Sequence, residues 1–209
     1  MLGYVNESSP NWVRPVLVFD MGAQTAQLIA RRVREAHMYS EIVSPKLSAE
    51  QILARKPLAL IVSGGPNSAY VDDSPHIDPQ LLDSGVPILG ICYGFQMLTQ
   101  MLGGKVASAG RHEYGKAEAT VATDCPLFAD TPAQQVVWMS HNDEAKALPP
   151  EAKVVASSPG AQIAAFEVKG RPIWGVQWHP EVRHSEYGSQ LIKNFLFKAA
   201  GLEPNWDPH

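Results

Sequence analysis

Short apolar runs alternate with helix-like segments in the first half of the sequence, and this alternation constrains the fold most. The runs are PVLVFD (15–20), EIVS (41–44), LALIVS (58–63) and VPILGI (86–91). Runs of this length are typical of buried strands. Between them, residues 23–36 carry apolar side chains at helical spacing, and residues 48–56 begin with capping-box spacing at Ser48 and Gln51. The alternation predicts right-handed crossovers and a parallel sheet that is covered by helices on both faces.

The second half carries a different pattern. Strand-like runs lie between Gly and Pro turns at 112–123, 134–141, 153–160, 161–170 and 171–179. They predict mixed or antiparallel strands added to the sheet. A closing helix is predicted over 185–200, where five apolar side chains share a face: Leu191, Ile192, Phe195, Leu196 and Ala199. We therefore expect an α/β fold, with a flavodoxin-like, mostly parallel central sheet and extra strands in the second half.

The totals fit one globular domain between two short ends. The chain has 209 residues, of which 45% are hydrophobic and 18% charged, and its formal net charge is −4. We expect residues 1–14 to be a tail, 15–200 the domain and the Pro-rich 201–209 a linker. Nucleic acid is not expected as a partner, because phosphate binding needs concentrated positive charge. The compact basic cluster at 31–35 fits a solvated helix face.

The cysteines and the N-terminus bear on the compartment. Two cysteines cannot make a disulfide framework, so we expect free thiols and a reducing compartment. The N-terminal stretch has neither the basic start nor the apolar region of a signal peptide. No run of about 18 apolar residues occurs, so no membrane span is expected. These observations predict a cytoplasmic protein.

The stretch GICYGFQ (90–96) follows the fourth apolar run and opens a predicted helix. Strand, Gly-x-Cys-x-Gly and helix together are the pattern of a nucleophile elbow, in which a sharp turn exposes the nucleophile. Gly90 and Gly94 must be small because the chain passes very close to them. The helix N-terminus favours a thiolate at Cys92, and its free N–H groups, including that of Tyr93, face a developing oxyanion. The alternative interpretation is a small core cysteine between packing glycines.

A cysteine nucleophile needs a base, and WGVQWHPEV (174–182) is the best source. A strand delivers His179, and Glu181 follows at i+2, on the same side of an extended segment. Glu181 is therefore placed to orient His179 in a triad with Cys92. By itself, the segment also fits a strand-end His-Pro turn with a solvated glutamate.

Two glycines in VSGGPNSAY (62–70) follow the third run. At the end of a parallel strand they let backbone N–H groups face a ligand, so Gly65 is a candidate for the second oxyanion donor. A plain turn is the alternative. The Lys-Ser/Thr ending of a phosphate loop is missing, and the histidines and cysteines lack the spacing of common metal motifs.

GICYGFQ and WHPEV resemble the motifs of the class I, triad-type glutamine amidotransferases. Further stretches are similar to the glutaminase domains of GMP synthetases within that family: DMGAQTAQLIARRVRE, SGGPNS, HEYGKAE, MSHNDE and WHPEVRHSEYGSQLIKNFLF. The resemblance covers about residues 15–200. It implies hydrolysis of the glutamine side-chain amide by Cys92, His179 and Glu181 through a glutamyl thioester, with the oxyanion held by Gly65 and Tyr93.

The resemblance also implies substrate contacts and a partner. Gln96 and a loop of Ser140, His141, Asn142 and Asp143 would grip the amino-acid end of L-glutamine. Ammonia would pass to an ATP pyrophosphatase domain or subunit that aminates XMP to GMP, and the linker expected at 201–209 would lead toward such a synthetase domain. No cofactor is implied for this domain, and ATP and magnesium are expected only in that synthetase partner.

The sequence departs from the family pattern at one position of the substrate loop, and two competing functions are considered beside the first. Bacterial members usually have Gly where this chain has Asn142, and Asn tolerates positive φ best among the other residues. A glutaminase serving a different acceptor is the second hypothesis, although DMGAQTAQLIARRVRE favours the GMP branch. The third is a non-catalytic regulatory domain on the same fold.

Overall fold

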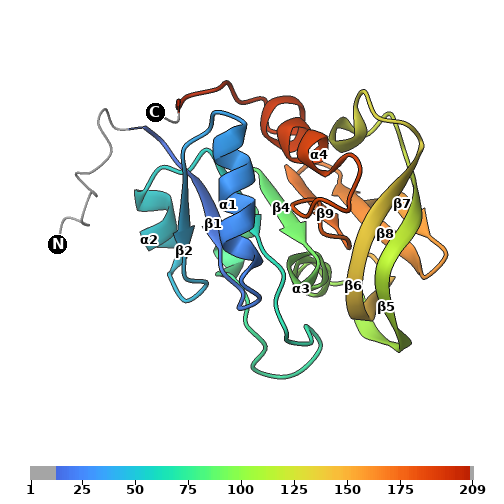
Figure 1. The fold of residues 1–209 in the computed structure, drawn as a ribbon. Helices are drawn as coiled ribbons and strands as arrows, with labels where there is room; N and C mark the ends of the chain where they lie inside the picture. Colours follow the sequence, from blue (N-terminus) through green and yellow to red (C-terminus); the bar gives the residue numbers. More distant parts are fainter. Residues whose placement is uncertain (1–12, 208–209) are drawn as a thin grey trace.

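The computed structural model describes residues 13–207, so residues 1–12 of the predicted tail and the last two residues of the chain lie outside the described residues. Within this range, nine strands form one central sheet (Figure 1). The strands are β1 Val16–Phe19, β2 Ser40–Val43, β3 Ala59–Val62, β4 Ile88–Ile91, β5 Lys105–Val121, β6 Gln134–Ala147, β7 Ala152–Ser158, β8 Ala161–Val168 and β9 Ile173–Val176. The helices are α1 Thr25–Glu35, α2 Ala49–Ala54, α3 Tyr93–Met101 and α4 Gly188–Asn194, with short 3-10 turns η1 Pro79–Asp83 and η2 Pro126–Phe128 and a π-helical turn η3 Phe195–Ala199.

The strand order in the sheet is β2-β1-β3-β4-β9-β8-β7-β5-β6. The first five strands in this order run parallel, and each later pair is antiparallel. The predicted α/β class, with antiparallel strands added in the second half, is confirmed. Because β1, β3, β4 and β9 are parallel neighbours, their carboxyl ends meet at one edge of the sheet.

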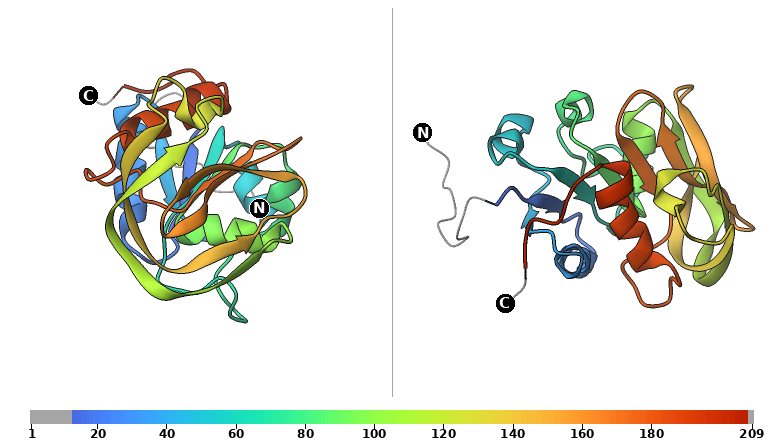
Figure 2. Two further views of the ribbon diagram at one scale, coloured as in Figure 1. Left: turned by 90° about the vertical axis from the view of Figure 1, so that its right-hand side faces the viewer. Right: turned by 90° about the horizontal axis from the view of Figure 1, so that it is seen from above.

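Alternate side chains of the parallel strands enter two separate cores. In β1, Val16 and Val18 belong to the core under α1 and α4, whereas Leu17 and Phe19 belong to the core under α2 and α3. Figure 2 shows the two helix layers on opposite faces of the sheet. Burial on both faces explains why these strands are continuous apolar runs rather than alternating ones.

The helix predicted over 185–200 is shorter and ends irregularly. The α-helical part is Gly188–Asn194, and it continues as the π-helical turn Phe195–Ala199. The expected apolar face is nevertheless buried, since Leu191, Ile192, Phe195 and Leu196 all lie in the core. The periodic pattern thus predicted the buried face better than the helix boundaries.

Residues 140–143 were expected in a loop, and this expectation is wrong. They lie within β6, paired with β5 on either side of a bulge between Ser108 and Glu113. Burial alternates along them, with His141 and Asp143 inside and Asn142 outside. The hydrophobic pattern does not indicate this strand, because the side chains that face inward here are polar.

The segment after η3 lies against the start of the sheet. Asn205 and Trp206 donate backbone hydrogen bonds to the carbonyl of His37, and the Asn205 side chain bonds Tyr39 N and Arg14 O. Residues 201–207 thus run back from α4 to the amino ends of β1 and β2 (Figure 1). The predicted tail boundary and linker, which concern what adjoins the domain, stay predictions. No helix within residues 13–207 has the length and apolar character that crossing a bilayer requires.

Candidate active site

Cys92 occupies a strained turn between β4 and α3. Its φ of 53° and ψ of −106° lie outside the regions that L-residues usually adopt. A Cβ on Gly90 would lie 2.6 Å from the carbonyl oxygen of Gly94, and a Cβ on Gly94 would lie 2.4 Å from that of Val62. Both distances are shorter than real contacts allow, so neither position accepts a side chain. The predicted elbow geometry is present, with the cysteine at the helix N-terminus.

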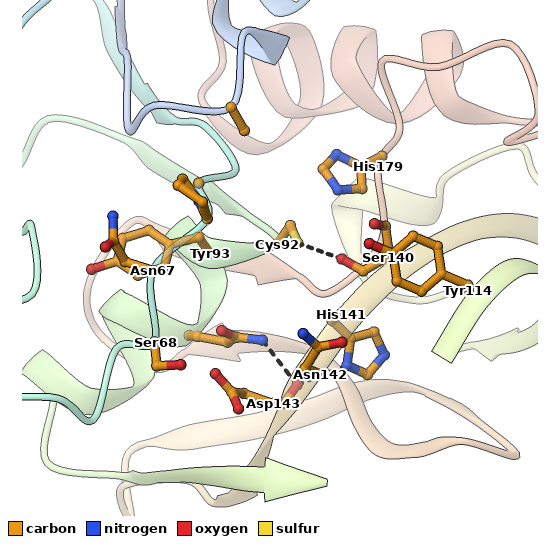
Figure 3. A pocket seen from close by; sticks show the side chains of 14 residues that line it. Asn67, Ser68, Cys92, Tyr93, Tyr114, Ser140, His141, Asn142, Asp143 and His179 are labelled. Carbon is orange, nitrogen blue, oxygen red and sulfur yellow. Dashed lines mark hydrogen bonds between the residues drawn. The ribbon is translucent and has the colours of Figure 1, made fainter. Parts of the chain in front are cut away.

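A cavity of about 360 Å³ opens beside Cys92, at the carboxyl ends of the parallel strands. This volume is within the usual range of small-molecule sites. Figure 3 shows its two walls, with Asn67 and Ser68 on one side and Tyr114 and the β6 residues on the other. Nine of the ten predicted site residues line it: Gly65, Cys92, Tyr93, Gln96, Ser140, His141, Asn142, Asp143 and His179. The tenth, Glu181, lies behind His179.

His179 and Glu181 form a close, buried pair. Nδ1 of His179 lies 2.6 Å from Oε1 of Glu181, whose side chain is completely buried. The other ring edge of His179 faces Cys92. A Cβ on Gly64 would be 3.0 Å from Cε1 of His179 and 3.6 Å from Cβ of Cys92. The three predicted triad residues are therefore brought together, with the backbone of Gly64 beside the gap between base and thiol.

The electrostatics of this group favour a charged imidazole. Burial on its own would lower the pKa of His179, but the hydrogen bonds and negative charges of Cys92 and Glu181 outweigh it and raise the pKa to about 11. A charged imidazole beside the Cys92 sulfur favours the thiolate form of the cysteine, so the arrangement suits a thiolate–imidazolium pair.

The turn that carries the pair is fixed to its neighbours on both sides. His179 N donates to the carbonyl of Trp138 in β6, and the Ser185 hydroxyl donates to the carbonyl of His179. On the other side, Nε of Arg32 in α1 donates to the carbonyl of Glu181. These contacts hold the base at a fixed depth relative to the cavity.

Two backbone N–H groups are candidates for holding an oxyanion. Gly65 and Tyr93 both line the cavity. Tyr93 is the first residue of α3, where the N–H has no partner within the helix. Among the described residues, no protein acceptor takes the N–H of Gly65. Tyr93 is also anchored through its hydroxyl, which donates to the carbonyl of Pro75.

Gln96 lies one turn into α3 and is largely occupied by protein contacts. Its Nε2 donates to the carbonyl of Asp143 at 3.0 Å and to Oε1 of Gln177 at 3.1 Å. Since Nε2 has two protons, both are used. Oε1 of Gln96 is therefore the atom left for a ligand in the cavity.

His141 connects the cavity wall to β5. Its Nδ1 lies 2.7 Å from the carbonyl oxygen of Asp143, and its Nε2 lies 2.6 Å from Oε2 of Glu113. Both ring nitrogens thus face acceptors, which fixes the ring between the carbonyl of Asp143 and the Glu113 carboxylate. Gly160 makes room for this pair, because a Cβ there would be 2.5 Å from the Glu113 carboxylate.

Asn142 does not adopt a positive φ, the conformation in which Asn can replace Gly. Among the described residues, the positive-φ positions do not include Asn142. It sits in β6 with its side chain exposed at the cavity rim. The strand geometry therefore makes no demand there for glycine or for its closest substitute.

Several lining residues were missed by the sequence reasoning. Asn67, Ser68 and Tyr114 line the cavity, and Gln177 lies behind it beside Cys92. The sequence carries a signal for Gln177, because this residue stands two positions before His179 on a predicted strand and its side chain therefore lies on the same side. The sequence carries no such signal for Tyr114, since the position of its side chain depends on how β5 pairs with β6. Within residues 13–207, no group of three or more His, Cys, Asp or Glu side chains forms a possible metal site.

The chain is similar to proteins of a known family. Residues 17–199 match the family model described as glutamine amidotransferase class-I. The GMP synthase (glutamine-hydrolyzing) of Thermobifida fusca is 54% identical over 191 residues, which are 91% of this chain and 36% of that protein. The enzyme of the same name from Mycobacterium tuberculosis (strain ATCC 25618 / H37Rv) is 55% identical over 195 residues, covering 93% of this chain and 37% of that protein. The chain thus spans little more than a third of the curated relatives it matches.

A solved structure agrees in fold. A crystal structure of a Thermoplasma acidophilum protein described as a GMP synthase subunit has a TM-score of 0.79 and 30% identity to this chain. The match covers 90% of this chain and 94% of that one.

Proposed function

The chain belongs to the class I glutamine amidotransferase family, and on that premise we propose that it hydrolyses L-glutamine to glutamate and ammonia with Cys92 as nucleophile. One observation carries the proposal. Cys92 stands in a strained turn at the N-terminus of α3, and the buried His179–Glu181 pair meets it at the same cavity. A strained nucleophile with an oriented base is the arrangement that acyl transfer requires.

In the first half of the reaction, the Cys92 thiolate attacks the side-chain amide carbon of glutamine. The carbonyl oxygen becomes an oxyanion, which accepts hydrogen bonds from the N–H groups of Gly65 and Tyr93. As the C–N bond breaks, the His179 imidazolium gives its proton to the leaving nitrogen, and ammonia departs. A glutamyl thioester on Cys92 and a neutral His179 remain.

The second half reverses these roles. Neutral His179 takes a proton from water while the water oxygen attacks the thioester carbon. Collapse of the second oxyanion breaks the C–S bond, releases glutamate and restores the thiolate–imidazolium pair. Glu181 keeps its contact with Nδ1 throughout, so the ring nitrogen facing the cavity is the one that gains and loses the proton.

The amino-acid end of the substrate would lie on the opposite wall. Oε1 of Gln96 is available there as an acceptor for the α-ammonium group, and the buried Asp143 side chain also lines the cavity. In this proposal Ser140, His141 and Asn142 complete the wall. Ser140 also contributes its carbonyl oxygen, which lies 3.4 Å from Sγ of Cys92.

The acceptor of the ammonia is proposed from the relatives. As the two relatives named above are glutamine-hydrolyzing GMP synthases, we infer that ammonia from this domain serves the amination of XMP to GMP. The partner would be an ATP pyrophosphatase domain or subunit, which would bind ATP and magnesium, whereas this domain needs no cofactor for glutamine hydrolysis. The two free cysteines fit a cytoplasmic setting.

The test measures ammonia release from glutamine by the chain alone and with a GMP-synthetase ATP pyrophosphatase domain, ATP, magnesium and XMP. We expect slow release alone, a rise with the complete partner mixture, and no release by Cys92→Ala. Cys125→Ala is the matched control, because Cys125 is buried outside the cavity lining and should leave release unchanged.

Two outcomes favour the competing functions. Ammonia release that depends on Cys92 but does not change with the partner domain and XMP would support the glutaminase activity and indicate another acceptor for the ammonia. A folded protein that releases no ammonia under any condition would favour a regulatory domain.

A further inference from the structure

Gln177 is a polar side chain with no exposed surface, and the mechanism above does not use it. It follows β9 directly, and its backbone N–H is fixed by the carbonyl of Ala164 at 2.8 Å. A buried amide is costly unless its donors and acceptors find partners. Its partners therefore indicate what the residue does.

The orientation of the Gln177 amide follows from a chain of hydrogen bonds. The carbonyl of Asp143 accepts only, so the group of Gln96 that faces it must be Nε2. Nε2 of Gln96 also faces Gln177, which must turn its oxygen toward it, at 3.1 Å. The nitrogen of Gln177 is then left facing Sγ of Cys92, at 3.9 Å.

Cys92 Sγ consequently has two fixed polar neighbours besides His179. The carbonyl of Ser140, at 3.4 Å, accepts a hydrogen bond from the thiol form. Nε2 of Gln177 is a donor, and a donor stabilises the thiolate form. Of these two neighbours, only Gln177 supports the reactive state.

We propose that Gln177 is a positioning residue for the nucleophile: its amide, held by Gln96, donates to the Cys92 sulfur, fixes its direction and stabilises it as a thiolate. The inference rests on the proposed function in so far as Cys92 is the nucleophile. Gln96 thereby joins the substrate wall to the nucleophile, because one nitrogen holds both Asp143 and Gln177. The alternative is that Gln177 only fills the space between α3 and β9.

The experiment measures alkylation of Cys92 by iodoacetamide across pH, read out by mass spectrometry of the Cys92 peptide. Gln177→Glu keeps the shape and still accepts from Gln96, but it places an oxygen where the donor was. We expect alkylation at neutral pH to slow by about tenfold or more, and the pH–rate profile to move to higher pH. Gln162→Glu makes the same change at an exposed position on β8 and should match the wild type. Cys125 serves as an internal reference in each digest.

A measurement on the unmodified protein covers the case in which Gln177→Glu does not fold. The side-chain amide resonances of Gln177 should shift with pH in step with the alkylation profile of Cys92, and Cys92→Ala should abolish that shift. Gln177 amide resonances that do not change with the protonation state of Cys92 would overturn the proposal. So would a folded Gln177→Glu protein in which Cys92 is alkylated at the wild-type rate.

Ammonia release separates this inference from the function itself. Gln177→Glu should lower kcat for glutamine and change KM less, since the thiolate rather than the substrate wall is affected. Alkylation needs no glutamine. A protein that fails to release ammonia but shows the Gln177-dependent alkylation would therefore retain the inference and lose the proposed reaction.

Discussion

Gly188, the first residue of α4, packs directly on the carbonyl group of Pro180: a Cβ at position 188 would lie 1.9 Å from that oxygen. Pro180 stands between His179 and Glu181, so the start of α4 bears on the turn that carries both side chains. The turn is also held by Trp138 and Ser185 on its other side. The closing helix therefore has a role in the site although none of its side chains enters the cavity lining.

Gly188→Ala should displace this turn. Since backbone at 1.9 Å cannot accommodate a methyl group, α4 or the turn must move, and we expect the free energy of unfolding to fall by about 2 kcal/mol or more. Glutamine hydrolysis should fall with it, because His179 moves with the turn. Urea unfolding and ammonia release measure the two effects. Ser189→Ala, at the exposed next position, is the control that should change neither.

Gly64→Ala should damage the reaction more than the fold. The added methyl would come within 3.0 Å of His179 Cε1, beside the gap to Cys92, but meets no backbone at a forbidden distance. We expect ammonia release to fall by about tenfold or more while the free energy of unfolding changes by about 1 kcal/mol or less.

Gly85→Ala is the matched control for this substitution and should give the reverse result. A side chain there meets nothing within 4 Å, but φ is +79°, so the cost is backbone strain far from the cavity. A Gly64→Ala protein with normal turnover would show that His179 and Cys92 do not need the space that this glycine leaves.

The charge on His179 should depend on Cys92. With its pKa raised to about 11, the ring should stay protonated through neutral pH, and Cys92→Ala should lower the midpoint of its NMR titration. Cys125→Ala should leave that midpoint unchanged. A wild-type His179 that titrates near 6.5 would contradict the ion pair.

The same shift has a consequence for stability. The folded protein binds the His179 proton more tightly than the unfolded chain, whose histidine has the ordinary pKa of 6.5. The contribution of this proton to folding is therefore complete below about pH 6.5 and is lost progressively as the pH rises toward about 11. This contribution is measured by comparing the free energy of unfolding of the wild type with that of Cys92→Ala across this pH range.

The sequence predicted the parts of the molecule in which chemistry or periodicity is local. The elbow at Cys92 is set by two glycines, each two residues from the cysteine, and the His179–Glu181 pair by the i+2 geometry of an extended chain. The parallel strands were visible because both of their faces are apolar.

What escaped prediction depends on contacts between distant segments. Tyr114 reaches the cavity only because a bulge sets the register of β5 against β6. The sequence does not indicate a strand at 140–143, because His141 is buried against Glu113 and the carbonyl of Asp143 accepts from Gln96, and neither contact is visible in the local pattern. The contacts of Asn205 with Arg14 and Tyr39 are of the same kind, since they join segments that lie far apart in the chain.

Asn205→Ala should separate stability from activity. Its side chain supplies a donor to the carbonyl of Arg14 and an acceptor for the N–H of Tyr39, at 2.9 and 3.1 Å, and both lie at the amino ends of β1 and β2. Loss of both bonds should lower the free energy of unfolding by about 1–3 kcal/mol.

The cavity lies at the opposite, carboxyl ends of the strands, so alkylation of Cys92 by iodoacetamide in Asn205→Ala should keep its wild-type rate below the unfolding transition. Glu203→Ala, exposed in the same segment, is the control for the substitution itself and should leave both stability and alkylation unchanged. If Asn205→Ala instead slowed alkylation while the protein stayed folded, the two ends of the sheet would be coupled. The segment 201–207 would then influence the nucleophile through β1 and β3, and not only secure the start of the sheet.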